Sequence, residues 1–175
     1  MEFYGATDKG IVRKENQDVF LCEDVRITGG ILLAVCDGMG GAKAGHIAST
    51  MGLNVFRDSF FKDLDPFYDE KAIAQSLVNA IQQANTEIYR RSCTDPECSG
   101  MGTTLVAAYV SRKDAVVANI GDSRAYIISR TGISQLSRDH SVVEDMIGRG
   151  EITRDEAKTR PSRNLITRAL GTGPQ

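Results

Sequence analysis

Residues Ile31 to Thr50 read ILLAVCDGMGGAKAGHIAST, and this stretch decides the fold. The uncharged run from Ile31 to Cys36 predicts a buried strand. Asp37 follows at the tip of that strand, and the glycines at 38, 40 and 41 permit a sharp turn. Helical spacing begins near Ala44. A carboxylate is therefore expected on a rigid element, either as a metal ligand or as part of an ordinary Asp-Gly turn.

The composition is that of one soluble globular domain spanning residues 1–175. Lys and Arg number 21 against 23 Asp and Glu, a net charge of −2, which argues against nucleic acid and against a polybasic membrane anchor as partners. The sequence has no run long enough to span a bilayer, and MEFYGATDKG lacks the apolar core of a signal peptide. We therefore expect a cytoplasmic protein without a membrane or nucleic-acid partner.

Four cysteines leave two interpretations open. Cys22 and Cys36 lie in apolar runs and are expected to be buried thiols. Cys93 and Cys98 flank the polar segment CTDPEC, where a disulfide or half of a zinc site is conceivable. Because no second Cys or His pair stands at a partner spacing, reduced thiols are favoured.

A second strand is expected just before the central one. The apolar run Val19 to Cys22 follows a charged connector, and Gly29-Gly30 turns the chain toward Ile31. Asp18 would begin the first strand and Asp37 would end the next. If a hairpin joins these antiparallel strands, the two carboxylates meet at the same edge of the sheet.

The remaining elements indicate an α+β protein with helices packed on antiparallel sheets. Apolar spacing predicts helices over Ala44–Phe61 and Glu70–Arg91. Short β-rich runs predict strands over residues 3–7, 103–111, 115–120, 124–129, 133–136 and 164–170, with those from 103 to 136 forming a meander. A short helix is expected from Asp139 to Gly148, and another after the capping box at Thr153, ending at Pro161.

Six motifs occur in a characteristic order: RKENQD (13–18), DGMGG (37–41), GMGTT (100–104), IGDSRAY (120–126), LSRDHS (136–141) and ITRALG (166–171). Together they resemble the metal-dependent protein Ser/Thr phosphatases of the PPM, or type 2C, family, in its bacterial branch. The resemblance implies two antiparallel β-sheets packed face to face with α-helices on the outside, an α-β-β-α sandwich. It also implies two Mn²⁺ or Mg²⁺ ions in each complete site, with a third possible.

The resemblance assigns a role to each candidate residue. Asp37 is similar to the ligand that bridges both metals, and the Gly38 carbonyl to a ligand of the second metal. Asp18 resembles the acidic residue that holds metal-bound water. Arg13 matches the arginine that contacts the substrate phosphate, and Asp122 matches a ligand of the third metal.

The residue types themselves suit the binding of metal ions and phosphate, independently of the resemblance. Carboxylate and carbonyl oxygens are hard ligands for Mg²⁺ and Mn²⁺, and an arginine fork matches a phosphate. Structural alternatives remain: Arg13 as a solvated turn residue, Asp18 as a strand-edge charge, and Asp122 as a residue that serves only the Gly121 turn. Neither His46 nor His140 is expected to be a general acid.

Some positions depart from the family pattern. Met39 stands where animal members have a histidine, and Gln17 where some members have Glu. The second Asp-Gly motif and the late Asp-Asn motif of the family do not occur after Gly171. The chain is therefore expected to be C-terminally truncated, to bind metal weakly and to be weakly active or inactive. Exposed sheet edges would then favour self-association.

The leading functional interpretation is a phosphatase that hydrolyses phosphoserine and phosphothreonine in phosphoprotein substrates of a Ser/Thr kinase. A different class of function is a catalytically dead, phosphatase-like module that binds a kinase or a regulator. A plain α+β scaffold with accidental Asp-Gly turns is a third, weaker interpretation, because the motifs occur in order.

Overall fold

The structure, a computed structural model, describes residues 1–62, 64 and 69–174. The strands are β1 (Asp18–Val25), β2 (Gly30–Met39), β3 (Gly102–Thr103), β4 (Leu105–Val110), β5 (Ala115–Ile120), β6 (Tyr126–Ser129) and β7 (Gly132–Gln135). The helices are α1 (Ala42–Lys62), α2 (Glu70–Thr94), α3 (Val142–Gly148) and α4 (Arg154–Thr159), with short 3₁₀ turns at Pro96–Cys98 and Pro161–Asn164.

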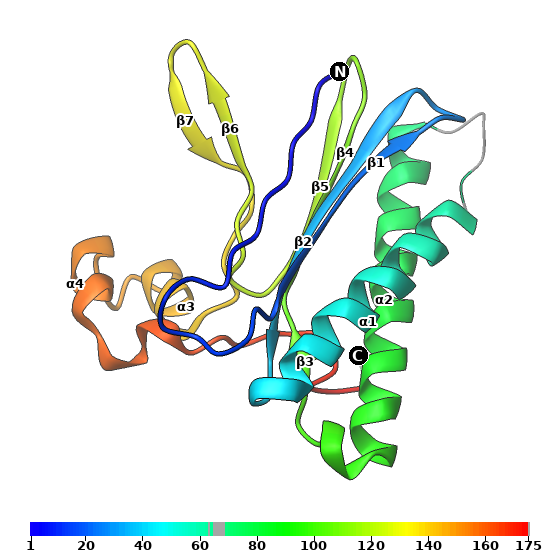
Figure 1. Cartoon of the computed structure of the whole chain (residues 1–175). Coiled ribbons are helices and arrows are strands. Elements are labelled where there is room, and N and C mark those ends of the chain that lie inside the picture. Colours follow the sequence, from blue (N-terminus) through cyan, green and yellow to red (C-terminus); the bar gives the residue numbers. More distant parts are fainter. Residues whose placement is uncertain (63, 65–68, 175) are drawn as a thin grey trace.

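A five-stranded antiparallel sheet is the central element of the fold (Figure 1). Its strands follow the order β1-β2-β4-β5, and β3 pairs with the far end of β2. The central strand β2 contains the uncharged run from Ile31 to Cys36, which predicted a buried strand. The separate hairpin β6–β7 forms a two-stranded sheet on the opposite side from the long helices.

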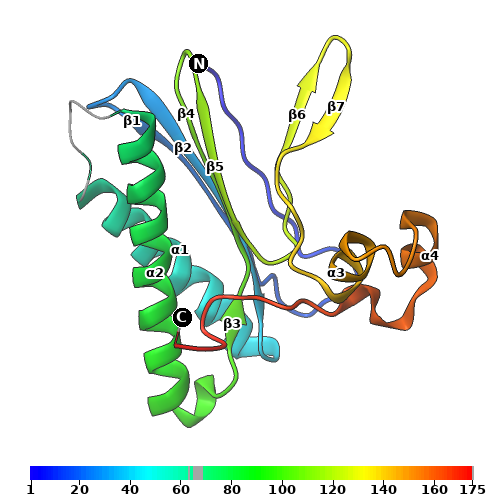
Figure 2. The ribbon, with the colours of Figure 1, turned by 180° about the vertical axis from the view of Figure 1, so that it is seen from behind.

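Helices α1 and α2 cover one face of the main sheet, as both views show (Figures 1 and 2). Side chains of β2 alternate, and Leu32, Ala34 and Cys36 point into the core beneath these helices. Phe56 and Phe60 of α1 are fully buried there. The first turn of α1 lies directly on the tip of β2, because a Cβ added to Gly38 would lie 1.9 Å from the Gly45 carbonyl oxygen.

The other face of the sheet is more open. Val35 is 44% exposed and Phe20 is 37% exposed, and both alternate with the core residues of their strands. The N-terminal segment passes over part of this face, since a Cβ on Gly5 would meet the ring of Phe20. Asp18 and Asp37 lie at one end of this face, and both residues are partly exposed.

Most predicted elements are confirmed, and so is the α+β class with antiparallel sheets. Residues 3–7 form no strand, because the N-terminal segment crosses the open face without pairing to a sheet edge. Residues 164–170 also form no strand: they make isolated bridges from Ile166 to Ser141 and from Leu170 to Thr103. A segment whose ends pair with two different neighbours cannot form a ladder with either. The predicted meander is interrupted after β5.

The structure shows the state of the four cysteines. Cys22, Cys36, Cys93 and Cys98 are all free thiols. Cys36 and Cys98 are buried, whereas Cys93 is exposed at the end of α2.

Among the described residues, every helix is too short or too polar to traverse a lipid bilayer.

Candidate functional site

Asp18 and Asp37 face each other across neighbouring strands. They are register partners in the antiparallel pair β1–β2, which confirms the prediction that both lie at the same edge of the sheet. Asp37 is half-buried, and Asp18 Oδ1 is buried without a hydrogen-bond partner in the described part of the chain. A buried carboxylate oxygen without a partner is costly, unless a ligand such as a cation satisfies it.

The electrostatics of this pair also favour a cation. The pKa of Asp37 is raised to about 6, chiefly by burial, and next by the charge of Asp18 and a hydrogen bond with the Asp18 carboxyl group. Arg13 opposes the shift, and the charge of Asp122 adds to it. Negative charge is therefore concentrated at the tip of β2. The two carboxylates fit Mg²⁺ or Mn²⁺, which prefer hard oxygen ligands.

The backbone of Asp37 is held on both sides by two threonines. Thr104 Oγ1 accepts a hydrogen bond from the Asp37 N–H at 3.0 Å. The Asp37 carbonyl accepts one from Thr103 Oγ1 at 3.0 Å and another from the Thr104 N–H at 2.9 Å. Gly38 N–H donates to the Gln17 carbonyl at 3.2 Å. The threonines of the GMGTT motif are thus positioning residues that the sequence alone did not identify.

A cavity of about 600 Å³ opens beside the carboxylates. Arg13, Asp37, Gly38 and Asp122 line it, so four of the five predicted site residues meet at one opening. Asp18 is not among the lining residues and lies at the neighbouring strand position. The lining also includes residues that the motifs did not assign to the site, namely Lys14, Glu15, Gln17, Met39, Gly40, Thr104, Asn164 and Ile166.

Arg13 reaches this cavity from the connector before β1. It is exposed, and its positive charge lowers the pKa of Asp37. None of the ion pairs in the described part of the chain involves Arg13. An unpaired guanidinium beside two carboxylates at a cavity mouth fits recognition of a phosphate.

Asp122 lines the cavity from the turn that follows β5. Gly121 has a φ of 104° and lies against Thr104, so the tight turn requires glycine. The Gly121 N–H donates to His140 Nδ1 at 3.1 Å, and the His140 N–H donates to the Gly121 carbonyl at 2.9 Å. Burial, followed by the charge of Arg168, lowers the pKa of His140, which agrees with an unprotonated Nδ1. His140 therefore supports a turn, as expected.

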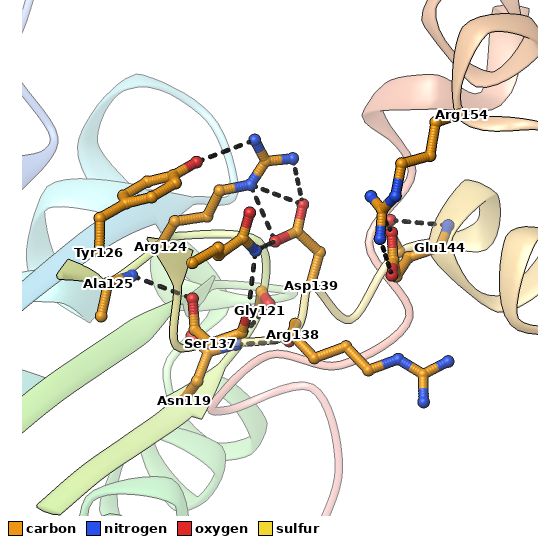
Figure 3. A network of polar contacts seen from close by, with 12 residues as sticks. Asn119, Gly121, Arg124, Ala125, Tyr126, Ser137, Arg138, Asp139, Glu144 and Arg154 are labelled. Carbon is orange, nitrogen blue, oxygen red and sulfur yellow. Dashed lines mark hydrogen bonds and ion pairs between the residues drawn. The ribbon is translucent and has the colours of Figure 1, made fainter. Parts of the chain in front are cut away.

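An ion pair fixes the segment after this turn. Asp139 is 7% exposed, and both its oxygens accept hydrogen bonds from Arg124 Nε at 2.9 Å (Figure 3). Arg124 Nη2 adds a contact of 2.5 Å, and Gln135 donates to Asp139 at 3.0 Å. Hydrogen bonding to Asp139 raises the pKa of Arg124. A buried carboxylate with this many donors makes a rigid anchor for the GDSR turn.

The described residues contain no group of three or more His, Cys, Asp and Glu side chains placed to hold one metal ion. Asp18 and Asp37 form a pair, and Asp122 lines the same cavity as Asp37 and raises the pKa of Asp37 through its charge. The geometry therefore provides two adjacent carboxylates, a third on the cavity wall, and one arginine.

Comparison with known proteins identifies the class. Residues 10–146 match the family described as Protein phosphatase 2C. The chain is 38% identical to the serine/threonine phosphatase stp of Listeria monocytogenes over 168 residues, which cover 94% of this chain and 65% of that protein. The chain belongs to the protein phosphatase 2C family.

Solved structures agree with this assignment. The serine/threonine phosphatase Stp1 from Staphylococcus aureus superposes with a TM-score of 0.89 at 38% identity, over 97% of this chain and 66% of that one. The catalytic domain of the phosphatase PstP in complex with two manganese ions superposes with a TM-score of 0.76 at 31% identity, over 94% of this chain and 64% of that one. This chain thus spans about 65% of the length of the Listeria relative.

Proposed function

We propose that the protein hydrolyses phosphoserine and phosphothreonine in phosphoproteins modified by a Ser/Thr kinase, with Mn²⁺ or Mg²⁺ as cofactor. The observation that carries the proposal is the register pair Asp18–Asp37, with its unpartnered buried oxygen, beside a cavity that Arg13 also lines. Family membership and the two manganese ions in the related PstP structure support it.

Each residue has a distinct part in this proposal. Asp37 would contact both ions, with the Gly38 carbonyl as a further ligand, and Asp18 would hold the water that attacks. Arg13 would bind two oxygens of the substrate phosphate and orient the phosphorus toward the carboxylates. Asp122 would hold a third ion at the cavity wall. Two divalent ions at such a centre supply an activated water nucleophile and offset the charge of the phosphoryl oxygens.

The charges bear on how tightly this chain would hold its ions. Two divalent ions bring four positive charges, and Asp18 and Asp37 together supply two negative ones. Ca²⁺, Mg²⁺ and similar ions bind more tightly as more anionic ligands replace their water shell. We therefore infer that the 175-residue chain binds Mn²⁺ weakly and turns substrate over slowly.

The test is release of inorganic phosphate from a phosphothreonine peptide with and without Mn²⁺, for the chain and for two variants. Release should depend on Mn²⁺ and should disappear in Asp37→Asn. Asp114→Asn, in the exposed turn between β4 and β5, is the matched control and should keep the wild-type rate. Full activity in Asp37→Asn would refute the ligand assignment. Peptide binding without any release would favour a binding module.

A further inference from the structure

A second cavity of about 560 Å³ adjoins the candidate site. It shares Lys14 and Glu15 with the first cavity, so the two openings lie next to each other at these residues. One wall is the connector before β1, and the other is the beginning of α1. The remaining lining residues are Lys9, Asn16, Lys43, His46 and Ile47. We call this second cavity the lysine groove.

The lining of the lysine groove carries more positive than negative charge. Lys9, Lys14 and Lys43 are exposed, and none takes part in an ion pair within the described ranges. Glu15 is the single acidic residue of the lining, and the first turn of α1 has no acidic residue. The lining therefore has a net charge of about +2 with His46 neutral. Lysine ammonium groups attract carboxylates and phosphates as point charges.

Hydrogen bonds hold the connector in place, and one of them joins it to the other wall. Asn16 Nδ2 donates to Thr7 Oγ1 at 2.8 Å, and its Oδ1 accepts the Asp18 N–H at 3.1 Å. Gln17 Nε2 donates to the Gly41 carbonyl at 2.8 Å, which ties the connector to the start of α1. The lysine groove therefore has a defined position next to Asp18, as a preformed subsite requires.

We propose that the lysine groove binds an anionic residue that flanks the phosphorylated residue of a substrate peptide. This inference rests on the proposed phosphatase function. With the substrate phosphate at Arg13, the neighbouring part of the peptide passes Lys14, which lines both cavities, and reaches Lys9 and Lys43. The anion is a carboxylate of Asp or Glu, or a second phosphate.

The test compares three fluorescent peptides that carry a non-hydrolysable phosphonate in place of phosphothreonine. Their flanking residues are alanine, aspartate or phosphoserine, and their dissociation constants are measured by anisotropy at fixed Mn²⁺. An exposed ion pair contributes only a modest binding free energy. The aspartate peptide should therefore bind more tightly than the alanine peptide, but by no more than about 3- to 10-fold. If a phosphorylated flank is the natural partner, the phosphoserine peptide should bind more tightly than the aspartate peptide, because its phosphate carries about two charges. The difference in affinity from the alanine peptide should decrease as the salt concentration rises.

The variant Lys9→Ala/Lys43→Ala should lose this preference without changing the affinity for the alanine peptide, because neither lysine lines the first cavity. Arginine at both positions should retain it. Lys113→Ala, an exposed lysine in the turn between β4 and β5, is the control and should leave all three affinities unchanged.

The outcomes separate the two proposals. Equal affinities for the three peptides, or a preference that survives in the double alanine variant, would overturn the lysine groove and leave the phosphatase proposal standing. A dissociation constant above about 1 mM corresponds to less than about 4 kcal/mol of favourable binding free energy. If all three peptides bind as weakly as that, both the lysine groove and the phosphatase proposal are overturned.

Discussion

The side-chain hydroxyl of Thr104 accepts the backbone N–H of Asp37 at 3.0 Å, although 67 residues separate them in the chain. The same hydroxyl lies 2.7 Å from Ser123 Oγ, next to Asp122. One buried side chain thus links the strand that carries the candidate bridging ligand to the turn that carries the third carboxylate. The relative position of Asp37 and Asp122 depends on it.

Replacing Thr104 with valine tests this link. Valine keeps the shape but leaves the Asp37 N–H and Ser123 Oγ without this partner. An unsatisfied buried donor costs about 1–3 kcal/mol, so the free energy of unfolding should fall by that amount in urea titrations. Thr104→Ser retains the hydroxyl and should lose less, about 1 kcal/mol for the missing methyl group. If serine is as damaging as valine, packing and not the hydrogen bond positions Asp37.

Close packing between β2 and α1 gives a second prediction. A methyl group on Gly38 would lie 1.9 Å from the Gly45 carbonyl oxygen, and the backbone of a helix cannot move away cheaply. Gly38→Ala should therefore destabilise the protein by at least about 2 kcal/mol. Gly148→Ala is a suitable control, because its methyl group would meet the flexible end of Arg138. Gly148→Ala should be neutral or slightly stabilising. Equal effects of the two substitutions would contradict the close contact.

The ion pair Arg124–Asp139 should be far more important than its neighbour Arg154–Glu144 (Figure 3). Asp139 is buried, whereas Arg154 is 74% exposed and lies 3.4 Å from Glu144. Arg124→Ala leaves a buried carboxylate without its main donors and should cost about 2–4 kcal/mol. Arg154→Ala should cost less than about 0.5 kcal/mol. Urea unfolding of both variants measures the difference, and similar losses would show that burial of Asp139 does not decide the effect.

The sequence predicted the parts of the fold that depend on local periodicity. The uncharged run before Asp37 and the helical spacing after Ala44 gave β2 and α1 correctly, because a buried strand and an amphipathic helix have different periods. The same reasoning placed Asp18 and Asp37 at one edge of the sheet, and the hairpin makes them register partners there.

Long-range contacts were beyond the reach of these patterns. Thr103 and Thr104 were visible only as part of a motif, because their hydrogen bonds to Asp37 span more than 60 residues. Residues 164–170 have the composition of a strand, but their backbone pairs at isolated points, and Ile166 lines the cavity instead. Strand propensity describes a pleated, half-buried surface and does not tell whether a neighbouring strand is available.

The raised pKa of Asp37 makes stability depend on pH in a definite direction. The pKa is about 6 in the folded protein and 3.8 in an unfolded chain, so between these values the folded state binds more protons. Without metal, the free energy of unfolding should therefore fall as pH rises from about 4 to about 6, by about 1–2 kcal/mol after allowance for solvent screening, and then level off. Asp37→Asn should lack this contribution. A wild-type curve parallel to that of Asp37→Asn over this range would contradict the shift.

Metal binding should reverse the sign of the effect of a neutral substitution at Asp37. In EDTA, Asp37→Asn removes the repulsion with Asp18 and should raise the free energy of unfolding at pH 7 by about 1 kcal/mol. With Mn²⁺ at ten times its dissociation constant, the wild-type protein should gain about 1.4 kcal/mol, and the variant should gain little. Thermal unfolding with and without Mn²⁺ measures both quantities. Asp114→Asn should behave as wild type in each condition, because its carboxylate lies in an exposed turn. If Asp37→Asn were instead less stable in EDTA and kept the full gain with Mn²⁺, the carboxylate pair would have a structural role and the ions would bind elsewhere.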